Sequence, residues 1–225
     1  MSKPYRTRPE IVGKKLGMTQ VFDKDGDAVP VTVIELSENI VTAIKTTDKN
    51  GYSAIQIGAY VKKESKLNKP KLGNLKKNSL PNLTYLKEFR MQEEHLAEYK
   101  IGEPIDTSKV LVENEKVDVT GKSIGKGFQG MVKLHNKHRG NKTHGSKSYR
   151  GPGSIGAHTE PGRVLPGKHM PARMGNENVT ARNLKVIEII KDKNLVLVKG
   201  AVPGVEGTLV IIRPSIKRWN AKSVN

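Results

Sequence analysis

One long stretch of this chain, from Lys122 to Arg173, cannot fold around a core of its own. Its few apolar residues recur neither every two nor every 3.6 positions for more than a turn, so they mark neither a strand nor an amphipathic helix. The stretch also holds 10 glycines and five of the chain's six histidines. We therefore predict that this basic stretch is flexible in isolation and takes a fixed path only against a partner.

The charge of the basic stretch indicates what that partner is. Its 11 Lys and Arg residues against one acidic residue, Glu160, supply +10 of the chain's formal charge of +18. Such runs are often solvated linkers, but here aromatic and imidazole rings alternate with the cations, and glycines let the backbone approach phosphates closely. These features favour nucleic acid, and a long irregular segment suits folded RNA better than the major groove of DNA.

The residues that we expect to contact RNA are the basic side chains of the stretch and the rings between them. They are Lys122, Lys126, Phe128, Lys133, His135, Lys137, His138, Arg139, Lys142, His144, Lys147, Tyr149, Arg150, His158, Arg163, Lys168, His169 and Arg173.

Two parts of the chain that flank this region read as β-structure. Short β-branched runs alternate with turn signals such as Asp25-Gly26 and Asn50-Gly51, which is typical of antiparallel strands. The runs are Met18–Phe22, Val29–Leu36, Ile40–Lys45 and Ala54–Gly58 near the amino end, and Leu184–Ile190, Asn194–Lys199 and Thr208–Arg213 near the carboxyl end. Each group alone would leave unpaired sheet edges, so we predict that both close into one discontinuous β-barrel of six or seven strands.

We expect four kinds of segment in this mainly β chain. The barrel body comprises residues 10–61, 103–121 and 183–214; residues 62–102 form a small inserted subdomain; residues 122–182 form an extended arm; residues 1–9 and 215–225 are basic tails. Within the inserted subdomain, Leu83, Leu86 and Phe89 recur every three residues and predict a short amphipathic helix over Leu83–Met91.

Composition excludes several classes of protein. No cysteine is present, so disulfides and thiolate metal sites are ruled out. The longest apolar runs, such as Leu195–Val198, have four residues, and no apolar region follows the basic amino terminus, so we expect neither a membrane span nor a secretory signal. Hydrophobic residues are only 35% of the chain, in agreement with a segment that never enters a core.

Three motifs suggest an enzyme or a metal site, and each has a simpler reading. Gly151-Pro-Gly-Ser-Ile-Gly156 fits the dinucleotide pattern, but no strand precedes it and no helical pattern follows it. Gly121–Lys126 resembles a phosphate-binding loop, but with wrong spacing and Gly127 where Ser or Thr is needed. His135, His138 and His144 have no carboxylates nearby, so we read them as RNA-facing imidazoles. We predict no catalytic residues, no metal site and no cofactor; Mg²⁺ would come only through bound RNA. Two alternatives remain: an RNA- or DNA-compacting protein outside translation, and an RNA-modifying or cofactor-using enzyme built around Gly151–Gly156.

The order of several motifs resembles a known family, that of ribosomal protein L-three of the large subunit. The similarity extends over nearly the whole chain. The matching motifs are Gly13–Phe22, Val117–Gly130, His144–Lys147, Gly151–Gly156, Pro161–Val164, Gly167-Lys168, Met174–Asn176 and Val198–Gly204. Asn50–Gln56, Lys69-Pro70 and Leu86–Arg90 look like the bacterial type, especially its cyanobacterial and plastid branch.

The resemblance implies a structural protein of the ribosome, with a barrel of the translation-protein type. It implies direct binding of 23S-type rRNA, an early role in assembly of the large subunit, and the fourteenth and nineteenth large-subunit proteins as neighbours. It implies no small-molecule substrate and no homo-oligomer, and a location on the ribosome in a bacterial cytoplasm or a plastid stroma. The arm would run toward the peptidyl-transferase centre, with its tip at Gly156, Ala157, His158, Thr159, Glu160 and Pro161. Some bacterial members carry a methylated glutamine where this chain has Thr159, so we expect no such modification.

Overall fold

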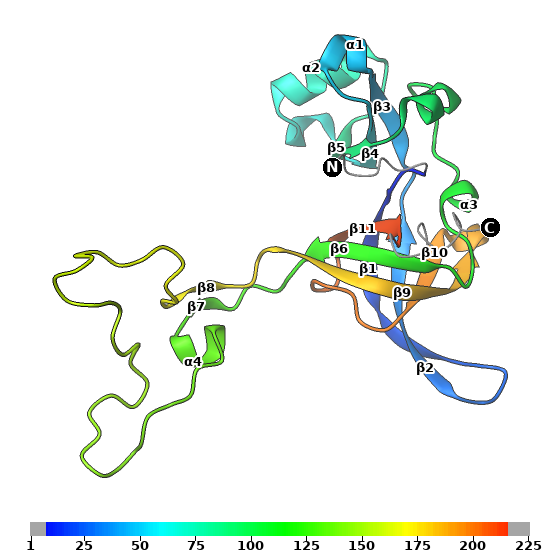
Figure 1. The fold of residues 1–225 in the computed structure, drawn as a ribbon. Helices are drawn as coiled ribbons and strands as arrows, with labels where there is room; N and C mark the ends of the chain where they lie inside the picture. Colours follow the sequence, from blue (N-terminus) through cyan, green and yellow to red (C-terminus); the bar gives the residue numbers. More distant parts are fainter. Residues whose placement is uncertain (1–7, 216–225) are drawn as a thin grey trace, which may run out of the picture. The chain divides into compact units, whose positions relative to one another are not determined.

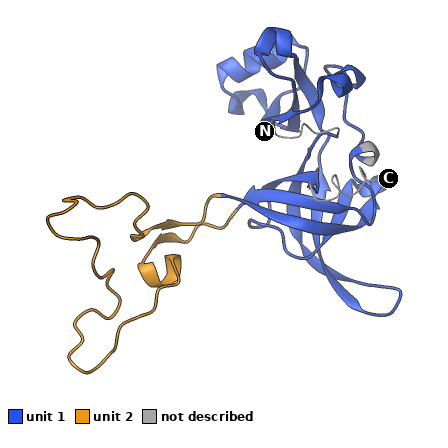
Figure 2. Ribbon diagram, in the orientation of Figure 1, with its two compact units in different colours: residues 1–122, 178–225 blue, residues 123–177 orange. Residues whose placement is uncertain are grey.

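Strands dominate the computed structural model, which describes residues 8–215, so the mainly β prediction is confirmed (Figure 1). The chain divides into two compact units (Figure 2). One, which we call the body, comprises the residues up to 122 and from 178 onward; the other, the arm unit, comprises residues 123–177.

Six strands of the body form a closed barrel in the order β1-β11-β6-β9-β10-β2, with β2 pairing back onto β1. All the neighbouring pairs are antiparallel. The strands are β1 (Ile11–Phe22), β2 (Ala28–Leu36), β6 (Lys116–Lys122), β9 (Asn178–Ile190), β10 (Leu195–Lys199) and β11 (Leu209–Pro214). The amino-terminal and carboxyl-terminal parts of the chain therefore share one sheet, which leaves no free edge among these six strands.

The register of the barrel explains where the two ends of the chain meet. Ile11 lies opposite Ile212 on β11, and Val210 lies opposite Gly121 on β6. Gly121 is required there, because a Cβ on it would lie 2.8 Å from the carbonyl oxygen of Pro203. Strand β6 ends at Lys122 and β9 begins at Asn178, and these two residues are paired. The chain thus leaves and re-enters the barrel on neighbouring strands.

Three further strands form a separate antiparallel sheet in the order β3-β4-β5. They are β3 (Ile40–Lys45), β4 (Ala54–Val61) and β5 (Leu83–Arg90). The prediction that residues 40–61 belong to the barrel is therefore wrong, because β3 and β4 pair with β5 and not with a barrel strand. Of residues 103–121, which were also assigned to the barrel, those from Lys116 onward lie in barrel strand β6.

The helix predicted over Leu83–Met91 is also wrong, because Leu83–Arg90 is strand β5. Leu83 and Phe89, both buried, also fit the two-residue period of a strand, and the backbone of β5 bonds to β4 from Leu83 to Arg90. The helix of this region lies earlier, at α2 (Lys69–Lys77), where Pro70 stands in the first turn. The remaining short helices of the body are α1 (Thr47–Asn50), η1 (Glu64–Lys66), η2 (Glu93–Glu98), α3 (Thr107–Val110) and η3 (Lys191–Lys193).

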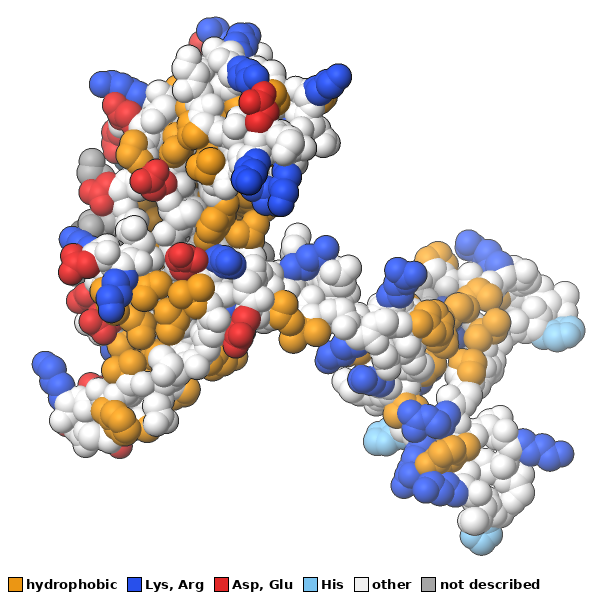
Figure 3. Space-filling model, turned by 180° about the vertical axis from the view of Figure 1, so that it is seen from behind, with side chains coloured by type: hydrophobic (Ala, Val, Ile, Leu, Met, Phe, Trp, Pro, Cys, Tyr) orange, Lys and Arg blue, Asp and Glu red, His pale blue; other side chains and the backbone are white. Residues whose placement is uncertain are grey.

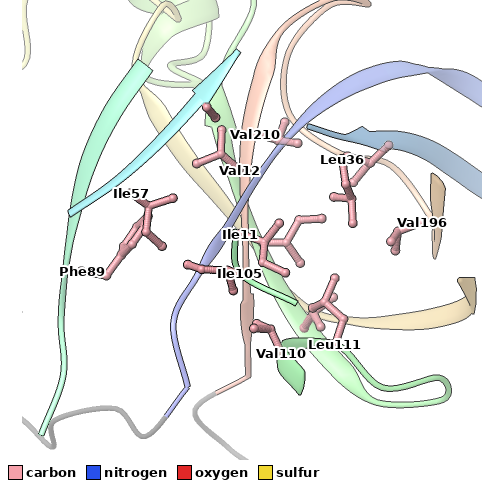
Figure 4. Close-up of a cluster of buried hydrophobic side chains, with 14 of the residues drawn as sticks. Ile11, Val12, Leu36, Ile57, Phe89, Ile105, Val110, Leu111, Val196 and Val210 are labelled. Atoms are coloured by element: carbon pink, nitrogen blue, oxygen red, sulfur yellow. The ribbon is translucent and has the colours of Figure 1, made fainter. Parts of the chain in front are cut away.

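One apolar cluster fills the barrel and continues under the three-stranded sheet (Figure 4). Ile11, Val196 and Val210 come from the barrel, whereas Ile57 and Phe89 come from β4 and β5. A second, smaller cluster of Ile40, Leu75, Leu80 and Leu83 joins α2 to the three-stranded sheet. Burial of these side chains, at roughly 25 cal/mol per Å² of apolar surface, is the main source of stability of the body.

A buried asparagine connects the barrel to the segment that leads into the three-stranded sheet. The Asn39 side chain accepts a hydrogen bond from the Val12 amide at 2.8 Å and donates to the carbonyl oxygens of Val12 and Ser37 at 3.1 and 2.8 Å. Its own carbonyl accepts from the Ile105 amide at 2.7 Å. All the polar atoms of this side chain are thus satisfied although only 3% of the residue is exposed.

The predicted bounds of the arm also need one correction. Residues 178–182, expected in the arm, lie in strand β9 and pair with β6. Of the predicted tails, residues 1–7 and 216–225 lie outside the described residues. Arg8 belongs to the body, where its guanidinium contacts the buried carboxylate of Glu115 at 2.7 and 3.1 Å.

Candidate nucleic-acid interface

The arm unit begins and ends in a short antiparallel ladder. Strands β7 (Gly127–Gln129) and β8 (Ala172–Met174) pair so that Phe128 lies opposite Arg173. The Lys126 amide donates to the Met174 carbonyl at 2.9 Å, and the Ser123 amide to the Glu177 carbonyl at 2.9 Å. The two ends of the unit are therefore held side by side, and the chain between them returns on itself (Figure 1).

A glycine permits this ladder to close. Gly175 has φ +74°, and a Cβ on it would lie only 2.1 Å from the carbonyl oxygen of Ile124. No other residue fits both the left-handed backbone and the close approach of the two chains.

Almost nothing in the arm unit is buried. Of residues 123–177, all of which the structure describes, Met131 alone is buried; it starts the single-turn helix α4 (Met131–Leu134). From His135 to Pro171 the chain has neither helix nor strand. This agrees with the prediction that the basic stretch has no core of its own.

A few local contacts hold the irregular part. The rings of His135 and His169 stack with centroids 4.1 Å apart and planes 2° from parallel. His135 Nε2 lies 3.1 Å from the Met170 carbonyl oxygen, which can only accept, so the ring donates there. These contacts join the two sides of the arm unit beyond the ladder.

A second group of contacts centres on Tyr149. Its hydroxyl accepts a hydrogen bond from the Arg139 guanidinium at 2.6 Å, and its carbonyl accepts from the Gly140 amide at 2.9 Å. The Arg139 guanidinium and the Lys142 ammonium each lie 5.7 Å from the centroid of the Tyr149 ring. One aromatic ring therefore gathers two cations at one place on the arm.

The cations of the arm unit face solvent without carboxylate partners. Within residues 123–177 no Lys or Arg forms an ion pair, and the two acidic residues are Glu160 and Glu177. On the face drawn in Figure 3, blue and pale-blue side chains stand along the arm unit and no red one is seen on it. The exposed basic side chains are Lys126, Lys133, Arg139, Lys142, Lys147, Arg150, Arg163, Lys168 and Arg173; Lys137 is half-buried, and Lys122 is exposed at the end of β6.

Two of these cations line a hollow. Lys137, Gly167, Lys168 and His169 line a shallow, open hollow of about 260 Å³. Gly167 has φ +76°, a left-handed backbone conformation, at the point where the chain lines the hollow just before Lys168. Two ammonium groups and an imidazole around one concavity are suited to a phosphate group.

The predicted stacking groups differ in their exposure. Phe128 is 70% exposed on β7, and His138, His144 and His158 are exposed, whereas His135 and Tyr149 are partly covered by the contacts described above. The predicted tip residues, 156 to 161, are all exposed, and His158 Nδ1 lies 2.7 Å from Thr159 Oγ1.

The structure brings together some predicted residues that are far apart in the sequence. His135 with His169, and Lys137 with Lys168, meet across the arm unit. Sequence reasoning assigned these residues to RNA one by one and missed the pairs, since no short motif joins positions so far apart. The Arg139–Tyr149 contact was missed as well, although an aromatic ring between two basic residues is a recognisable signal.

The dinucleotide reading of Gly151–Gly156 is not supported by its surroundings. No strand precedes this motif and no helix follows it, so there is no helix terminus to hold a pyrophosphate. Among residues 8–215 no group of three His, Asp or Glu side chains is placed to hold a metal ion. No helix in the same range is long and apolar enough to cross a membrane.

Residues 8–215 thus combine a body that contains a closed β-barrel with a cation-rich arm unit in which Met131 alone is buried. The family model for "Ribosomal protein L3" matches residues 84–195. A large ribosomal subunit protein uL3 of Picosynechococcus sp. is 48% identical over 91% of this chain and 95% of its own length. The uL3 protein of Gloeothece citriformis is 50% identical over 91% and 96%, and the protein uL3c of Phaeodactylum tricornutum is 45% identical over 91% and 98%.

The chain belongs to the ribosomal protein L3 family. Its relatives are named as proteins of the large ribosomal subunit and not as enzymes. They are of the bacterial and plastid type, so the predicted location on a ribosome in a bacterial cytoplasm or a plastid is confirmed.

Proposed function

We propose that this protein binds large-subunit rRNA directly through residues 122–173 and supports early assembly of the large subunit. The arm runs toward the peptidyl-transferase centre, and the fourteenth and nineteenth large-subunit proteins are neighbours of the body, a barrel of the translation-protein type. Any Mg²⁺ at the arm comes with the RNA.

One observation carries the proposal: the basic side chains of the arm unit form no ion pair and all except half-buried Lys137 are exposed, while only Met131 of the unit is buried. Exposed like charges repel one another, so they favour a compact path only when a polyanion neutralises them. Each phosphate contact releases condensed counterions from the RNA, which supplies the free energy for ordering the arm. Binding and ordering of the arm are then a single event.

The tip acts by packing and not by proton transfer. Residues 156 to 161 offer one carboxylate, Glu160, and one imidazole, His158, both exposed and neither joined to a second acid or base. A general acid or base needs a partner that positions it and adjusts its affinity for protons. Glycine and proline around these groups instead provide a narrow backbone that fits between RNA segments.

The salt dependence of binding tests the proposal. The full chain is titrated with a large-subunit rRNA fragment at several salt concentrations, beside a variant in which a short Gly-Ser linker replaces residues 123–177. We expect the variant to remain folded, because its barrel strands are all in the body. The slope of log K against log salt should become shallower by roughly 0.7 to 0.9 for each phosphate that the variant no longer neutralises. An unchanged slope would reject the proposal.

A pair of substitutions tests the hollow with the arm kept in place. Lys137→Ala with Lys168→Ala removes two cations from the hollow, and Lys49→Ala with Lys66→Ala removes two exposed cations from the body. We expect the first variant to lose about tenfold or more in affinity for the rRNA fragment, and the second less than about threefold. Equal losses would mean that only net charge matters. Equal affinity of the full chain for the rRNA fragment and for duplex DNA of the same length would indicate a general compacting protein.

A further inference from the structure

The body contains a groove that the basic arm does not use. It lies where the barrel meets the three-stranded sheet and has a volume of about 300 Å³. Glu35 and Glu38 lie on one side, at the end of β2 and just after it; Tyr60 and Val61 lie on the other, at the end of β4. The apolar lining is Ile40 and Leu83, which are buried, and Val61, which is 65% exposed.

Neither carboxylate of the groove has a cationic partner within residues 8–215. No ion pair involves Glu35 or Glu38 among the described residues. Lys14 stands opposite Glu35 in the β1–β2 ladder, but its side chain runs toward Gly207. The Lys14 Cε atom lies 3.7 Å from the place that a Cβ on Gly207 would occupy. In a chain of net charge +18, a concave site with two free carboxylates is unusual. It attracts a cation and repels a phosphate.

The groove also has a strained wall. Tyr60 has φ +61°, a left-handed backbone conformation that is unfavourable for a bulky residue. It is missing from the β4–β5 pairing, although Ala59 and Val61 on either side are paired. Its hydroxyl donates to the Glu35 carbonyl at 3.3 Å, so the ring is held across the groove. Strain that persists in this way is typical of a binding site.

A buried hydroxyl completes the polar lining. Ser37 Oγ has no hydrogen bond of normal geometry, although it is buried. The nearby Tyr60 hydroxyl is affected mainly by burial and by the Glu35 carboxylate, which raise the pKa of Tyr60 to about 12, while Ser37 acts weakly in the opposite direction. Ser37 therefore lies beside the Tyr60 hydroxyl at this wall of the groove.

We propose that this groove binds a lysine or arginine side chain on an extended segment of another protein of the large subunit. The cationic group lies between Glu35 and Glu38, and its aliphatic stem packs on Ile40, Val61 and Leu83. Basic side chains combine such a stem with a charged end, so they match an apolar lining with carboxylates at its rim. The volume suits one or two side chains and not a folded domain. The site is independent of RNA binding by the arm.

A photo-crosslinking experiment on assembled subunits identifies the occupant. A benzophenone amino acid replaces Val61, whose side chain is exposed at the groove, in the full-length chain expressed in cells. Large subunits are purified, irradiated and analysed by mass spectrometry. We expect a crosslink to a Lys- or Arg-containing segment of another protein. A crosslink to rRNA, a crosslink to residues 216–225 of the same chain, or no crosslink would each overturn the proposal.

The glutamates provide the matched comparison. In the crosslinking chain, Glu35→Gln with Glu38→Gln removes the two charges of the groove, and Glu94→Gln with Glu206→Gln removes two exposed charges elsewhere on the body. We expect the yield of the protein crosslink to fall at least fivefold in the first variant and to stay unchanged in the second. Equal yields in both variants would reject a role for the carboxylates. The slope of rRNA binding against salt should not change in either variant, so failure here is separate from failure of the arm proposal.

Discussion

His135 stacks face to face with His169 at a centroid distance of 4.1 Å, and this contact joins the outgoing and the returning chain of the arm unit. The pair lies next to the hollow lined by Lys137 and Lys168. We therefore expect the two stacked histidines to help position Lys137 and Lys168.

Replacement of His169 tests the stack, because the hydrogen bond to the Met170 carbonyl comes from His135 and not from His169. His169→Ala removes the stack and leaves the backbone of the hollow less ordered, so we expect affinity for the rRNA fragment to fall about three- to tenfold, or roughly 1 kcal/mol. His169→Phe keeps a flat ring and should stay within about twofold of the parent chain. The measurement is equilibrium binding at fixed salt. If both variants bind alike, the stack does not order the hollow.

Gly175 tests the closure of the arm's base. Gly175→Ala would place a Cβ 2.1 Å from the Ile124 carbonyl oxygen at φ +74°, so the β7–β8 ladder should open locally. Gly127→Ala is the matched control, because Gly127 has φ +67° with nothing within 4 Å. It should cost only the left-handed backbone, roughly 1 kcal/mol.

Hydrogen exchange followed by NMR reports the difference. The Lys126 amide, which donates to Met174, should lose its protection in Gly175→Ala and keep most of it in Gly127→Ala. Equal protection in the two variants would show that the close approach to Ile124 does not matter.

Asn39 should be among the most sensitive polar positions of the body. Asn39→Ala removes three side-chain hydrogen bonds and leaves the amide and carbonyl of Val12 without these partners, so we expect a loss of about 2 to 4 kcal/mol in the free energy of unfolding. Asn50→Ala, at an exposed position, should change it by less than about 0.5 kcal/mol. Urea denaturation of the two variants measures both values, and similar midpoints would contradict this account.

The ion pair between Lys45 and Glu88 makes a small, pH-dependent contribution to stability. The atoms Lys45 Nζ and Glu88 Oε1 are 2.7 Å apart. The hydrogen bond from Lys45 lowers the pKa of Glu88, with a further contribution from Tyr52, and the hydrogen bond to Glu88 raises the pKa of Lys45. The Glu88 contribution is therefore present above the ordinary glutamate pKa of 4.5 and is lost as pH falls through the lowered value. The Lys45 contribution is present below 10.5 and is lost as pH rises through the raised value.

Lys45→Met should therefore destabilise the body only between these limits. Because both side chains are about one-quarter to one-third exposed, we expect about 0.5 kcal/mol or less near pH 7. The difference from the parent chain should shrink below about pH 4 in urea titrations. Lys76→Met, which breaks the exposed pair with Glu64, is the control and should cause no measurable change. A loss in Lys45→Met that is constant with pH would point to packing of the aliphatic stem instead.

Periodicity and turn signals predicted the strands well but not their partners. The seven predicted β-branched runs coincide with strands, except that Asn194 and Thr208 lie one residue before β10 and β11. Gly26 and Gly51, expected in turns, have positive φ. Which strands join the barrel depends on pairing between distant segments. The run at Val117–Thr120 was not recognised as a strand, although it lies within residues 103–121, which were assigned to the barrel and contain most of β6. Strands β3 and β4, which were also assigned to the barrel, pair outside it.

The error at Leu83–Met91 has a physical cause. Leucines and phenylalanine at every third position fit a helix, but Leu83 and Phe89 also fit one face of a strand. The segment is a strand because it pairs with the edge of β4, and no pattern within residues 83–91 indicates that this edge is available. At the candidate site, charge and glycine content identified the basic stretch as a whole, whereas the pairs across it require the fold of the returning chain.

Because Met131 is the single buried residue of the arm unit, substitutions elsewhere in that unit should be almost silent in a thermal melt of the purified protein. A screen that ranks variants by melting temperature would rate the arm as tolerant of change and the body as fragile. Growth or ribosome yield should rank the same variants differently, because in the proposed function the RNA supplies the scaffold that the arm lacks.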